Sequence, residues 1–595
     1  MAETLISPGV FLQENDLSQI TQGPVQAGAA LLGPTVTGPV NIPTLVTTYS
    51  QYKALFGAAF VSGGASYEYL TSMAALNYFE QGGSSLLVTR VVTGSYTPAT
   101  ASLLNAAGTV ALVLETLTAG IVMNNNNGSL SGSGTVNGAL PTGSSANIRW
   151  EVTSMDSGSG IFNLIVRRGD DYQSSKTVLE TWNGLSLDPN QTNYVSYVIG
   201  DQTNTIAQDD LGNYYLQTTG SYQNKSKYLR VKNVNTPTPG YFNQYGQPAS
   251  NQYTSSLPLP GSGSNNGSFG TATGAIFGQI NREPVNFFES IPNVASDYTL
   301  SSYSIPRNIQ GLYASDYDLA INLLSSKDAY AFNVLYAPGL TNVNAPSQIT
   351  NIVNTVQTRG DAIAVVDMVG YGQSIPTAIT QANGFDNSYA ATYYPWLQVR
   401  SRETGKVNFV PASTIVPAAY EYNDRVSAEW FAPAGLNRGA LSTVLQPERK
   451  LTSSDRDRLY QASINPIATF PGVGTVIYGQ KTLQGKASAL DRVNVRRLLI
   501  ALKSYIGQIG ESIVFEPNTQ VTRNKFISQV NPYLESVQQR QGLYSFQVVM
   551  DDTNNTPDVI DRNQLVGSIY LQPTKTAEFI QLDFNILPTG TTFGQ

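Results

Sequence analysis

The sequence predicts a multidomain α/β and α+β protein, in which an α/β middle domain is interrupted by an inserted, mainly β region. Strand and helix patterns alternate over residues 27–92 and resume near Ser315, as in an α/β domain. Between them, short β-rich runs are separated by Gly-, Ser- and Asn-rich stretches. After residue 450, two long helical patterns precede alternating strands, which indicates a C-terminal α+β domain.

A chain of 595 residues is too long for one hydrophobic core, so several domains are expected. The composition shifts suggest a nested layout, because the α/β pattern stops at Val92 and returns about 200 residues later. The expected division is an N-terminal arm (1–20), a discontinuous α/β domain (21–93 and 300–450), an inserted, protruding β region (94–299) and a C-terminal domain (451–595) that ends in an arm (577–588).

The elements of the α/β domain follow from periodicity and from glycine and proline punctuation. Its first half should contain a strand at Ala27–Gly33, a helix at Ser50–Phe56 ended by Gly57, a helix at Tyr67–Gln81 ended by a double glycine, and a strand at Leu86–Val92. Its second half should contain a buried strand at Ala329–Tyr336, a helix at Pro346–Thr358, a buried strand at Ala362–Met368 and a strand at Ser388–Val399.

The C-terminal domain should begin with an amphipathic helix over Asp491–Ile509, because Leu498, Leu502 and Ile509 recur on one side at about 100° per residue. Arg492, Arg496 and Lys503 fall within about 40° of one another on the same helical wheel. They predict a basic ridge beside the apolar face. Without further information, a solvated helix flank is the simpler interpretation of such a row.

A second helix should begin near Thr522 and bury Phe526, Val530, Tyr533, Leu534 and Val537. Pro532 should kink or split this helix, since proline has no N–H and clashes with the preceding turn. Gly542 suits a helix end with a positive φ. Strands should follow at Leu543–Met550 and Leu565–Leu571, and a final strand should place Ile580, Leu582, Phe584 and Ile586 on one face.

Composition excludes several kinds of chemistry. The chain has no histidine and no cysteine, so it offers no imidazole base, thiolate nucleophile or Cys/His zinc site. A net charge of −7 argues against a general nucleic-acid binder. No apolar run approaches 20 residues and no secretory signal is visible, so neither membrane insertion nor export is expected.

Three local patterns with a chemical alternative are better explained by structure. Asp316 and Asp318 could hold a hard cation, but a helix cap is favoured because no third ligand is evident. Asp455 and Asp457 lie at a similar helix start after Thr452. The glycines of Phe470–Thr475 precede a strand and not a helix, so a plain turn is predicted in place of a phosphate cradle. No catalytic residue, metal ligand or cofactor is therefore assigned.

Several long motifs carry a family resemblance. They are the segments Arg456–Pro466, Asp491–Leu498, Phe515–Asn518 and Asp551–Asn563, with Ser7–Glu14 near the start of the chain. In this order they resemble contractile-tail sheath proteins, most closely the sheaths of T4-like phages. The resemblance covers the N-terminal arm, the first α/β half and roughly residues 316–587, and leaves the inserted region uncovered.

The resemblance implies a non-enzymatic virion protein, made and assembled in the bacterial host cytoplasm. Such a protein would form stacked hexameric rings around an inner tail tube, contract to drive the tube through the host envelope for genome delivery, and meet baseplate and tail terminator proteins. Arg492, Arg496 and Lys503 would then contact the tube. Terminal arms would exchange strands with neighbouring subunits through two sets of residues: Val10 and Leu12, and Ile580, Leu582, Phe584 and Ile586.

Other functions remain open at this point. The sheath of a phage-derived injection or secretion device would have the same sequence features. A carboxylate-based glycosidase is the enzyme class that a chain without histidine and cysteine still permits. A surface adhesin would use the Asn/Gly/Ser-rich inserted region to bind a receptor.

Overall fold

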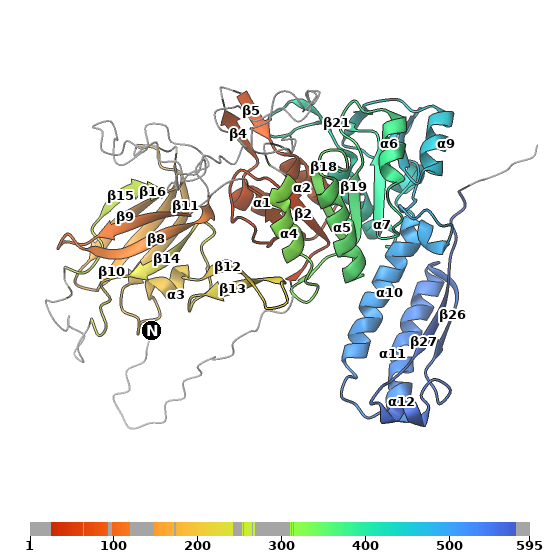
Figure 1. Cartoon of the computed structure of the whole chain (residues 1–595). Coiled ribbons are helices and arrows are strands. Elements are labelled where there is room, and N and C mark those ends of the chain that lie inside the picture. Colours follow the sequence, from red (N-terminus) through yellow and green to blue (C-terminus); the bar gives the residue numbers. More distant parts are fainter. Residues whose placement is uncertain are drawn as a thin grey trace, which may run out of the picture.

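The computed structural model describes residues 25–578 (Figure 1), apart from 63–64, 93–97, 120–147, 170, 172–173, 242–252, 254, 265, 268–309, 311 and 313. Both predicted terminal arms lie outside the described residues. This applies to Val10 and Leu12 at one end and to Ile580, Leu582, Phe584 and Ile586 at the other.

The central element is an eight-stranded sheet in the order β25-β24-β20-β19-β18-β2-β6-β3. Its inner strands run parallel, and β3 and β25 are antiparallel at the two edges. The strands come from both sides of the inserted region: β2 (Ala29–Gly33), β3 (Thr44–Val46), β6 (Leu86–Arg90), β18 (Val334–Thr341), β19 (Ile363–Asp367), β20 (Ala390–Tyr394), β24 (Asn465–Phe470) and β25 (Gly474–Ile477).

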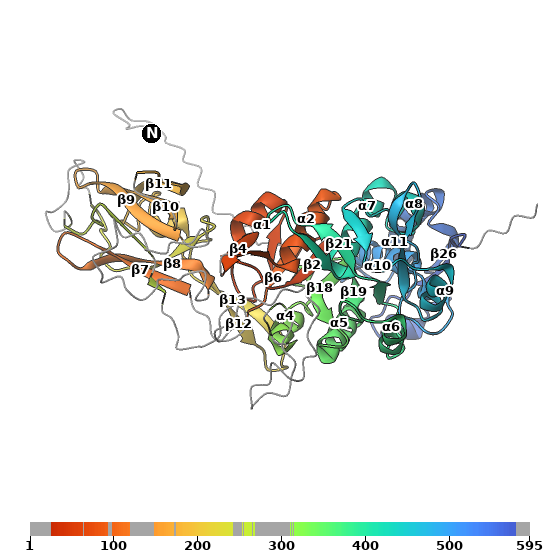
Figure 2. The ribbon, with the colours of Figure 1, turned by 90° about the horizontal axis from the view of Figure 1, so that it is seen from above.

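Helices cover both faces of this sheet, because alternate residues of its buried strands point to opposite sides. On β2, Ala30 and Leu32 face one core, and Ala29 and Leu31 face the other. The first core packs against α4 (Asp318–Leu323), α5 (Pro346–Arg359), α6 (Ile375–Ala382) and α9 (Ser453–Gln461). The second packs against α1 (Tyr49–Phe56), α2 (Leu70–Glu80) and α7 (Val416–Val426), as the view from above shows (Figure 2).

Most of the predicted α/β elements are confirmed within one to three residues. Two predictions are wrong. Ala329–Tyr336 is not one strand, because it covers the short β17 (Tyr330–Ala331) and only the start of β18. Ser388–Val399 is not a single strand either. The chain breaks at Pro395, which has no N–H to donate, and the indole of Trp396 donates instead to the Val369 carbonyl at 2.9 Å. The second part, β21 (Leu397–Arg400), leaves the main sheet and pairs with β22 (Val407–Val410) and β23 (Val444–Pro447).

Short elements connect these larger ones. They are β1 (Val25–Gln26) paired with β17 (Tyr330–Ala331), β4 (Ala59–Ser62) paired with β5 (Ala65–Glu68), α8 (Gly435–Arg438), and the 3-10 turns η2 (Ala314–Tyr317), η3 (Ala412–Thr414) and η4 (Ala489–Asp491). The β5 strand explains why α2 begins at Leu70 and not at Tyr67 as predicted.

Among the described residues between 98 and 267 there are two four-stranded sheets, with the orders β11-β10-β9-β15 and β14-β8-β7-β16. Leucines, valines and Phe162 from both sheets form one shared core. The strands are β7 (Pro98–Leu104), β8 (Val110–Ala119), β9 (Ile148–Asp156), β10 (Ile161–Arg168), β11 (Val178–Ser186), β14 (Leu229–Val234), β15 (Gly261–Ser264) and β16 (Asn266–Gly267), with helix α3 (Val195–Ile199) at one end.

Several contacts join the described residues of the inserted region to the α/β part, among them the hydrogen bond from the Gly38 N–H to the Thr118 hydroxyl at 3.2 Å. Arg90, at the end of β6, is fully buried and donates to the carbonyls of Gly38 and Ala119. The hairpin of β12 (Thr203–Gln208) and β13 (Tyr214–Thr219) reaches α4, where Tyr214 and Leu216 pack against the main core (Figure 1).

The C-terminal unit contains α10 (Val493–Glu511), α11 (Gln520–Gln539), β26 (Leu543–Val549), α12 (Pro557–Asp561) and β27 (Ser568–Pro573). Phe526, Val530, Leu534 and Val537 of α11 are buried, as predicted, and Tyr533 is only partly buried against the same core. However, α11 continues through Pro532, so the predicted split is wrong. Packing of the apolar face on both sides of the proline outweighs the loss of one backbone hydrogen bond.

A second correction concerns the end of α11. The positive φ falls at Gln541 (64°) and not at Gly542. Glycine is needed at 542 for close approach, because an added Cβ would lie 2.6 Å from the Val537 side chain and 3.1 Å from Trp430. Trp430 therefore packs directly on the turn that ends α11.

Candidate assembly interface

Helix α10 belongs to two hydrophobic cores at once. Val493 and Ile500 pack in the core of the α/β part, and Leu498 and Leu502 pack in the core of the C-terminal unit. The residues from Val493 to Leu498 are all buried, although the later turns of α10 are exposed on one side. One continuous helix therefore connects the two units.

A buried ion pair fixes the first turns of α10 against α7. Arg497, 3% exposed, donates through both terminal nitrogens to Asp424, with Nη1 2.8 Å from Oδ1. Its guanidinium also lies 4.8 Å from the centre of the Tyr420 ring. Burial alone would lower the pKa of Arg497, but the Asp424 carboxylate outweighs burial and raises it, so this arginine stays charged.

Sequence reasoning assigned no role to Arg497, although a signal was present. Its spacing from Val493 and Ile500 places it on the helix face that packs against the α/β part. A cation on an otherwise apolar face requires a buried carboxylate partner, and Asp424 provides it.

Arg492 fixes the segment that follows β27. Its Nε and Nη2 donate to the two carboxylate oxygens of Glu578 at 2.7 and 3.0 Å. Tyr460 and Gln480 also donate to Glu578, at 2.7 and 3.1 Å. Burial alone would raise the pKa of Glu578, but these hydrogen bonds outweigh burial and lower it.

The three predicted ridge residues do not form a continuous solvated row. Arg496 is 4% exposed, and its guanidinium lies 4.0 Å from the Tyr389 ring centre while donating to Ser388. Lys503, in contrast, is exposed and lies 3.4 Å from the Tyr389 hydroxyl. Of the three, Lys503 alone is exposed and without a carboxylate or buried contact of the kind that holds Arg492 on Glu578 and Arg496 against Tyr389.

The far end of the C-terminal unit carries exposed apolar side chains. The loop between α10 and α11 presents Phe515, which is fully exposed and has a positive φ of 69°. Val514 and Val521 beside it are 59% and 76% exposed. This group of three residues is called the apolar tip below. Sequence reasoning quoted the Phe515 segment only as a family motif and missed its exposure.

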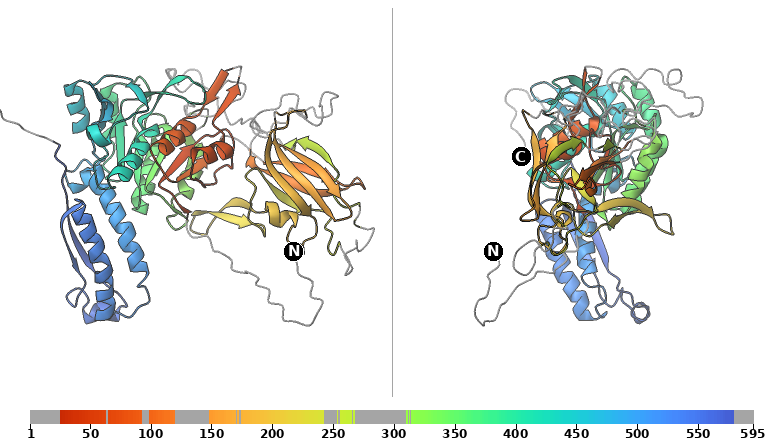
Figure 3. Two further views of the ribbon diagram at one scale, coloured as in Figure 1. Left: turned by 180° about the vertical axis from the view of Figure 1, so that it is seen from behind. Right: turned by 90° about the vertical axis from the view of Figure 1, so that its left-hand side faces the viewer.

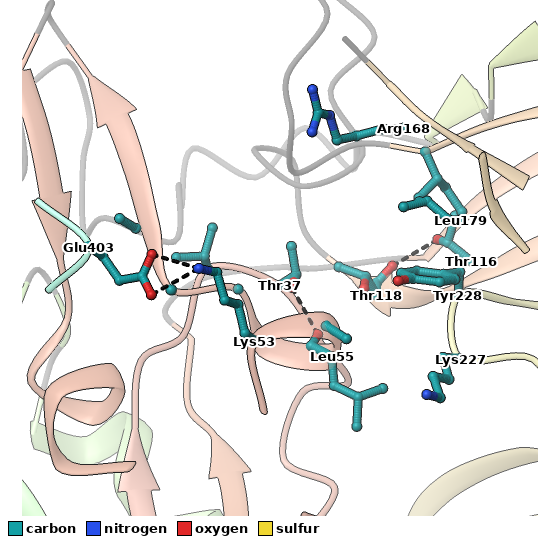
Figure 4. Close-up of a pocket in the computed structure, with 16 residues that line it drawn as sticks. Thr37, Lys53, Leu55, Thr116, Thr118, Arg168, Leu179, Lys227, Tyr228 and Glu403 are labelled. Atoms are coloured by element: carbon teal, nitrogen blue, oxygen red, sulfur yellow. Dashed lines mark hydrogen bonds and ion pairs between the residues drawn. The ribbon is translucent and has the colours of Figure 1, made fainter. Parts of the chain in front are cut away.

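A cavity of about 350 Å³ lies at the junction of the inserted region and the α/β part (Figure 4). Lys53 on α1 donates to both carboxylate oxygens of Glu403, at 2.9 and 2.7 Å, on one side of it, and Tyr228 lies on the opposite side. Glu403 is the one carboxylate among its described lining residues. The cavity therefore lacks the carboxylate pair that a glycosidase needs.

The other patterns singled out in the sequence have structural roles. The predicted side-chain cap of α4 is not formed, because Tyr317 is its N-cap residue; Asp318, the first residue of α4, instead accepts a hydrogen bond from Gln348 at 2.9 Å. Thr452 and Asp455 form a capping box on α9. Phe470–Thr475 is the turn between β24 and β25, as predicted. Across the described ranges, no cluster of three or more acidic residues could hold a metal ion, and no helix has the length and apolar character of a membrane span.

Comparison with known proteins is consistent with this arrangement. Residues 311–483 match the family described as phage tail sheath protein central domain, and residues 486–586 match the phage tail sheath C-terminal domain. The tail sheath protein of Vibrio phage KVP40 is 34% identical over 312 residues, which is 47% of this chain and 46% of the relative. The tail sheath protein of Enterobacteria phage T4 is 40% identical over 187 residues, or 31% and 28% of the two chains.

The matched stretches thus span less than half the length of either relative. The fold comparison is more extensive. The crystal structure of a sheath tail protein from Listeria innocua superimposes with a TM-score of 0.52 at 11% identity, covering 92% of this chain and 95% of that one. The resemblance to T4-like tail sheaths is confirmed by the matches of residues 311–483 and 486–586 to the two phage tail sheath domains and by the sheath relatives.

Proposed function

We propose that this chain is the sheath subunit of a contractile phage tail. It polymerises as stacked hexameric rings around an inner tube and contracts to drive the tube through the host envelope. The observation that carries the proposal is the pair of adjoining family matches, which run together from residue 311 to residue 586 in the order expected of a sheath. The relatives carry the name of a structural sheath protein, so no catalytic activity is proposed.

The domain layout predicted from the sequence belongs to this proposal. The discontinuous α/β domain (21–93 and 300–450) is supported by the central sheet, in which β2 lies between β18 and β6. The 94–299 region would face outward, and residues 451–595 would form the inner domain. The central sheet does not end at the proposed boundary at residue 451, because β24 and β25, which follow this residue, belong to the same sheet as β20.

Strand exchange between copies is supported by the small sheet of the C-terminal unit. Among the described residues, β26 and β27 pair only with each other, so both strands keep an open outer edge. An open edge accepts an extended segment through main-chain hydrogen bonds. The arms with Val10 and Leu12 and with Ile580, Leu582, Phe584 and Ile586 are the proposed partners of these edges.

The C-terminal unit would face the tube, and baseplate and tail terminator proteins would meet the ends of the sheath. The assembled protein would be part of the virion tail after synthesis in the host cytoplasm. Contraction would release free energy by moving the subunits from one lattice packing to a deeper one, with no nucleotide hydrolysis. The rigid connection through α10 would transmit this movement from the C-terminal unit to the α/β part.

Electron microscopy of the purified chain, with and without tube protein and a nucleating baseplate, tests the proposal. Striated sleeves of two lengths and diameters are expected. Dispersed monomers at high concentration with tube and nucleator present would refute it.

The tube contact is tested most cleanly at Lys503. Charge reversal at Arg492 or Arg496 would also break contacts within the chain, whereas Lys503 is exposed. Lys503→Glu should weaken sheath-on-tube assembly, and the defect should depend on salt because the contact is electrostatic. Lys327→Glu, an exposed charge reversal on the α/β part, is the matched control.

A further inference from the structure

The apolar tip combines two features that a free monomer has no reason to keep. Phe515 is fully exposed, and its positive φ is a conformation that a bulky residue rarely adopts. Val514 and Val521 extend the exposed apolar surface on both sides of the loop. Strained backbone and clustered exposed apolar side chains are typical of a binding surface.

The loop is also held in one shape. Asn518 donates to the Gln564 carbonyl at 2.8 Å and accepts from Arg523 at 3.0 Å. The Thr522 hydroxyl donates to the Pro517 carbonyl at 2.7 Å. These bonds tie the tip to α11 and to the segment after α12, so Phe515 is presented without the ordering cost that a loose loop would add on binding.

The orientation of the C-terminal unit indicates which molecule the apolar tip contacts in an assembled sleeve. The inserted region, the α/β part and the C-terminal unit follow one another along a line, and α10 and α11 run crosswise to that line (Figures 1 and 3). If the C-terminal unit faces the tube and the inserted region faces outward, as the proposed function requires, the tip points along or around the sleeve. It therefore points to another copy of this chain and not into the bore.

The same chain carries a groove whose lining combines aromatic and charged side chains. A cavity of about 600 Å³ is lined by residues of α8 and α9 and by the segment 576–578. Tyr460 and Tyr478 contribute aromatic surface, Pro466 contributes apolar surface, and the Arg456 guanidinium lies 5.7 Å from the Tyr478 ring centre. Aromatic and guanidinium groups together favour a phenyl ring. In Figure 1, α9 lies at one end of the molecule's short axis and α12 lies at the other. The loop that carries the apolar tip is hydrogen-bonded to the segment just after α12.

We propose that the apolar tip of one copy seats in this aromatic groove of the next copy. A contact between two different surfaces of the same chain is heterologous, and its repetition builds a helical stack and not a closed dimer. This inference rests on the proposed function and adds to it a side-chain contact that is separate from the exchanged strands.

Because the natural chain has no cysteine, cross-linking gives a direct test. One batch carries Phe515→Cys and a second carries Ser453→Cys, an exposed residue that lines the groove. The two batches are mixed, assembled and treated with a short bismaleimide. A covalent dimer is expected in assembled sleeves and not in monomers, since each copy has only one thiol. Leu211→Cys, 88% exposed on the β12–β13 hairpin, replaces Phe515→Cys in the control and should give no dimer.

A second variant, Phe515→Gly, removes the side chain and relieves the positive φ, so the isolated chain should unfold at an equal or higher temperature. Its critical concentration for assembly should nevertheless rise roughly tenfold or more, as for the loss of a buried aromatic anchor. Leu211→Gly should leave assembly unchanged.

Two results would overturn the inference while leaving the proposed function intact. One is sleeves of Phe515→Gly that form at the wild-type concentration, and the other is a Phe515→Cys cross-link to tube protein in place of a second copy. Failure of the wild-type chain to form sleeves would overturn both.

Discussion

Asp367 gives the sharpest prediction about stability, because it is a buried carboxylate without a cation beside it. It ends β19, is 4% exposed, and accepts hydrogen bonds from the backbone N–H of Ser413 at 3.2 Å and from the Ser413 hydroxyl. Burial raises the pKa of Asp367 from 3.8 to about 7, against the opposing effect of these two hydrogen bonds. At neutral pH the buried Asp367 therefore lowers the free energy of unfolding. The folded chain must hold either a poorly solvated charge or a proton that the unfolded chain has released.

The sign follows from proton binding. Between about pH 4 and pH 7 the folded chain keeps a proton on Asp367 that the unfolded chain has released, so the free energy of unfolding falls as pH rises through this window. The two pKa values correspond to at most about 4.4 kcal/mol, and local relaxation should reduce this to roughly 2–3 kcal/mol. Asp367→Asn should therefore stabilise the chain at pH 8 and have little effect near pH 4, close to the ordinary aspartate pKa of 3.8.

Urea unfolding at a series of pH values checks this, and the indole of Trp396 is a suitable reporter because it donates to the carbonyl of Val369, two residues from Asp367. No imidazole titrates in this range, because the chain has no histidine. Burial also raises the pKa of Glu421 to about 7, so the comparison is between the pH dependences of the variant and the wild type, which share Glu421. Glu535→Gln on the exposed face of α11 is the matched control. An Asp367→Asn chain whose stability depends on pH as strongly as the wild type would refute the reasoning.

Three further changes test the described contacts. Arg497→Gln should lower the free energy of unfolding by about 3–5 kcal/mol, because it leaves Asp424 without its buried partner. The control is Arg562→Gln at the exposed end of α12, which should cost under about 0.5 kcal/mol. Calorimetry of both variants measures the difference. Gln541→Gly should stabilise the end of α11 by about 0.5–1 kcal/mol, since φ is 64° there, and a lower melting temperature would contradict this. Leu216→Ala should loosen the β12–β13 hairpin from α4, which faster amide exchange in α4 would reveal and unchanged exchange would exclude.

Elements with a strong local pattern could be predicted from the sequence. The amphipathic period of α10 and the Gly57 stop of α1 both correspond to the observed helices. Pro532 and Ser388–Val399 could not be predicted, because long-range packing decided them. The apolar face of α11 kept the helix intact around its proline, and the Trp396 indole took a partner outside the main sheet.

The candidate interface was only partly predictable for a related reason. A helical wheel shows that Arg492, Arg496 and Lys503 share one side of α10, and it does not show what the rest of the chain places against that side. Tyr389 and Glu578, which are about 100 and 90 positions away along the chain, bind two of the three cations. Lys503 lies about two turns after Arg496 and stays exposed, although its Nζ reaches the Tyr389 hydroxyl at 3.4 Å.

The position of the inserted region in the central sheet has a consequence for variation among related chains. Strand β6, which precedes it, is separated from β18, which follows it, only by β2, and all three run parallel. Gln310, just after the insertion, accepts a hydrogen bond from the Leu70 N–H and donates to the Pro338 carbonyl, beside the end of the same sheet. Both boundaries of the inserted region thus lie at the same part of the central sheet. The inserted region can therefore be replaced by a different one, in evolution or by engineering, without interrupting a strand of this sheet.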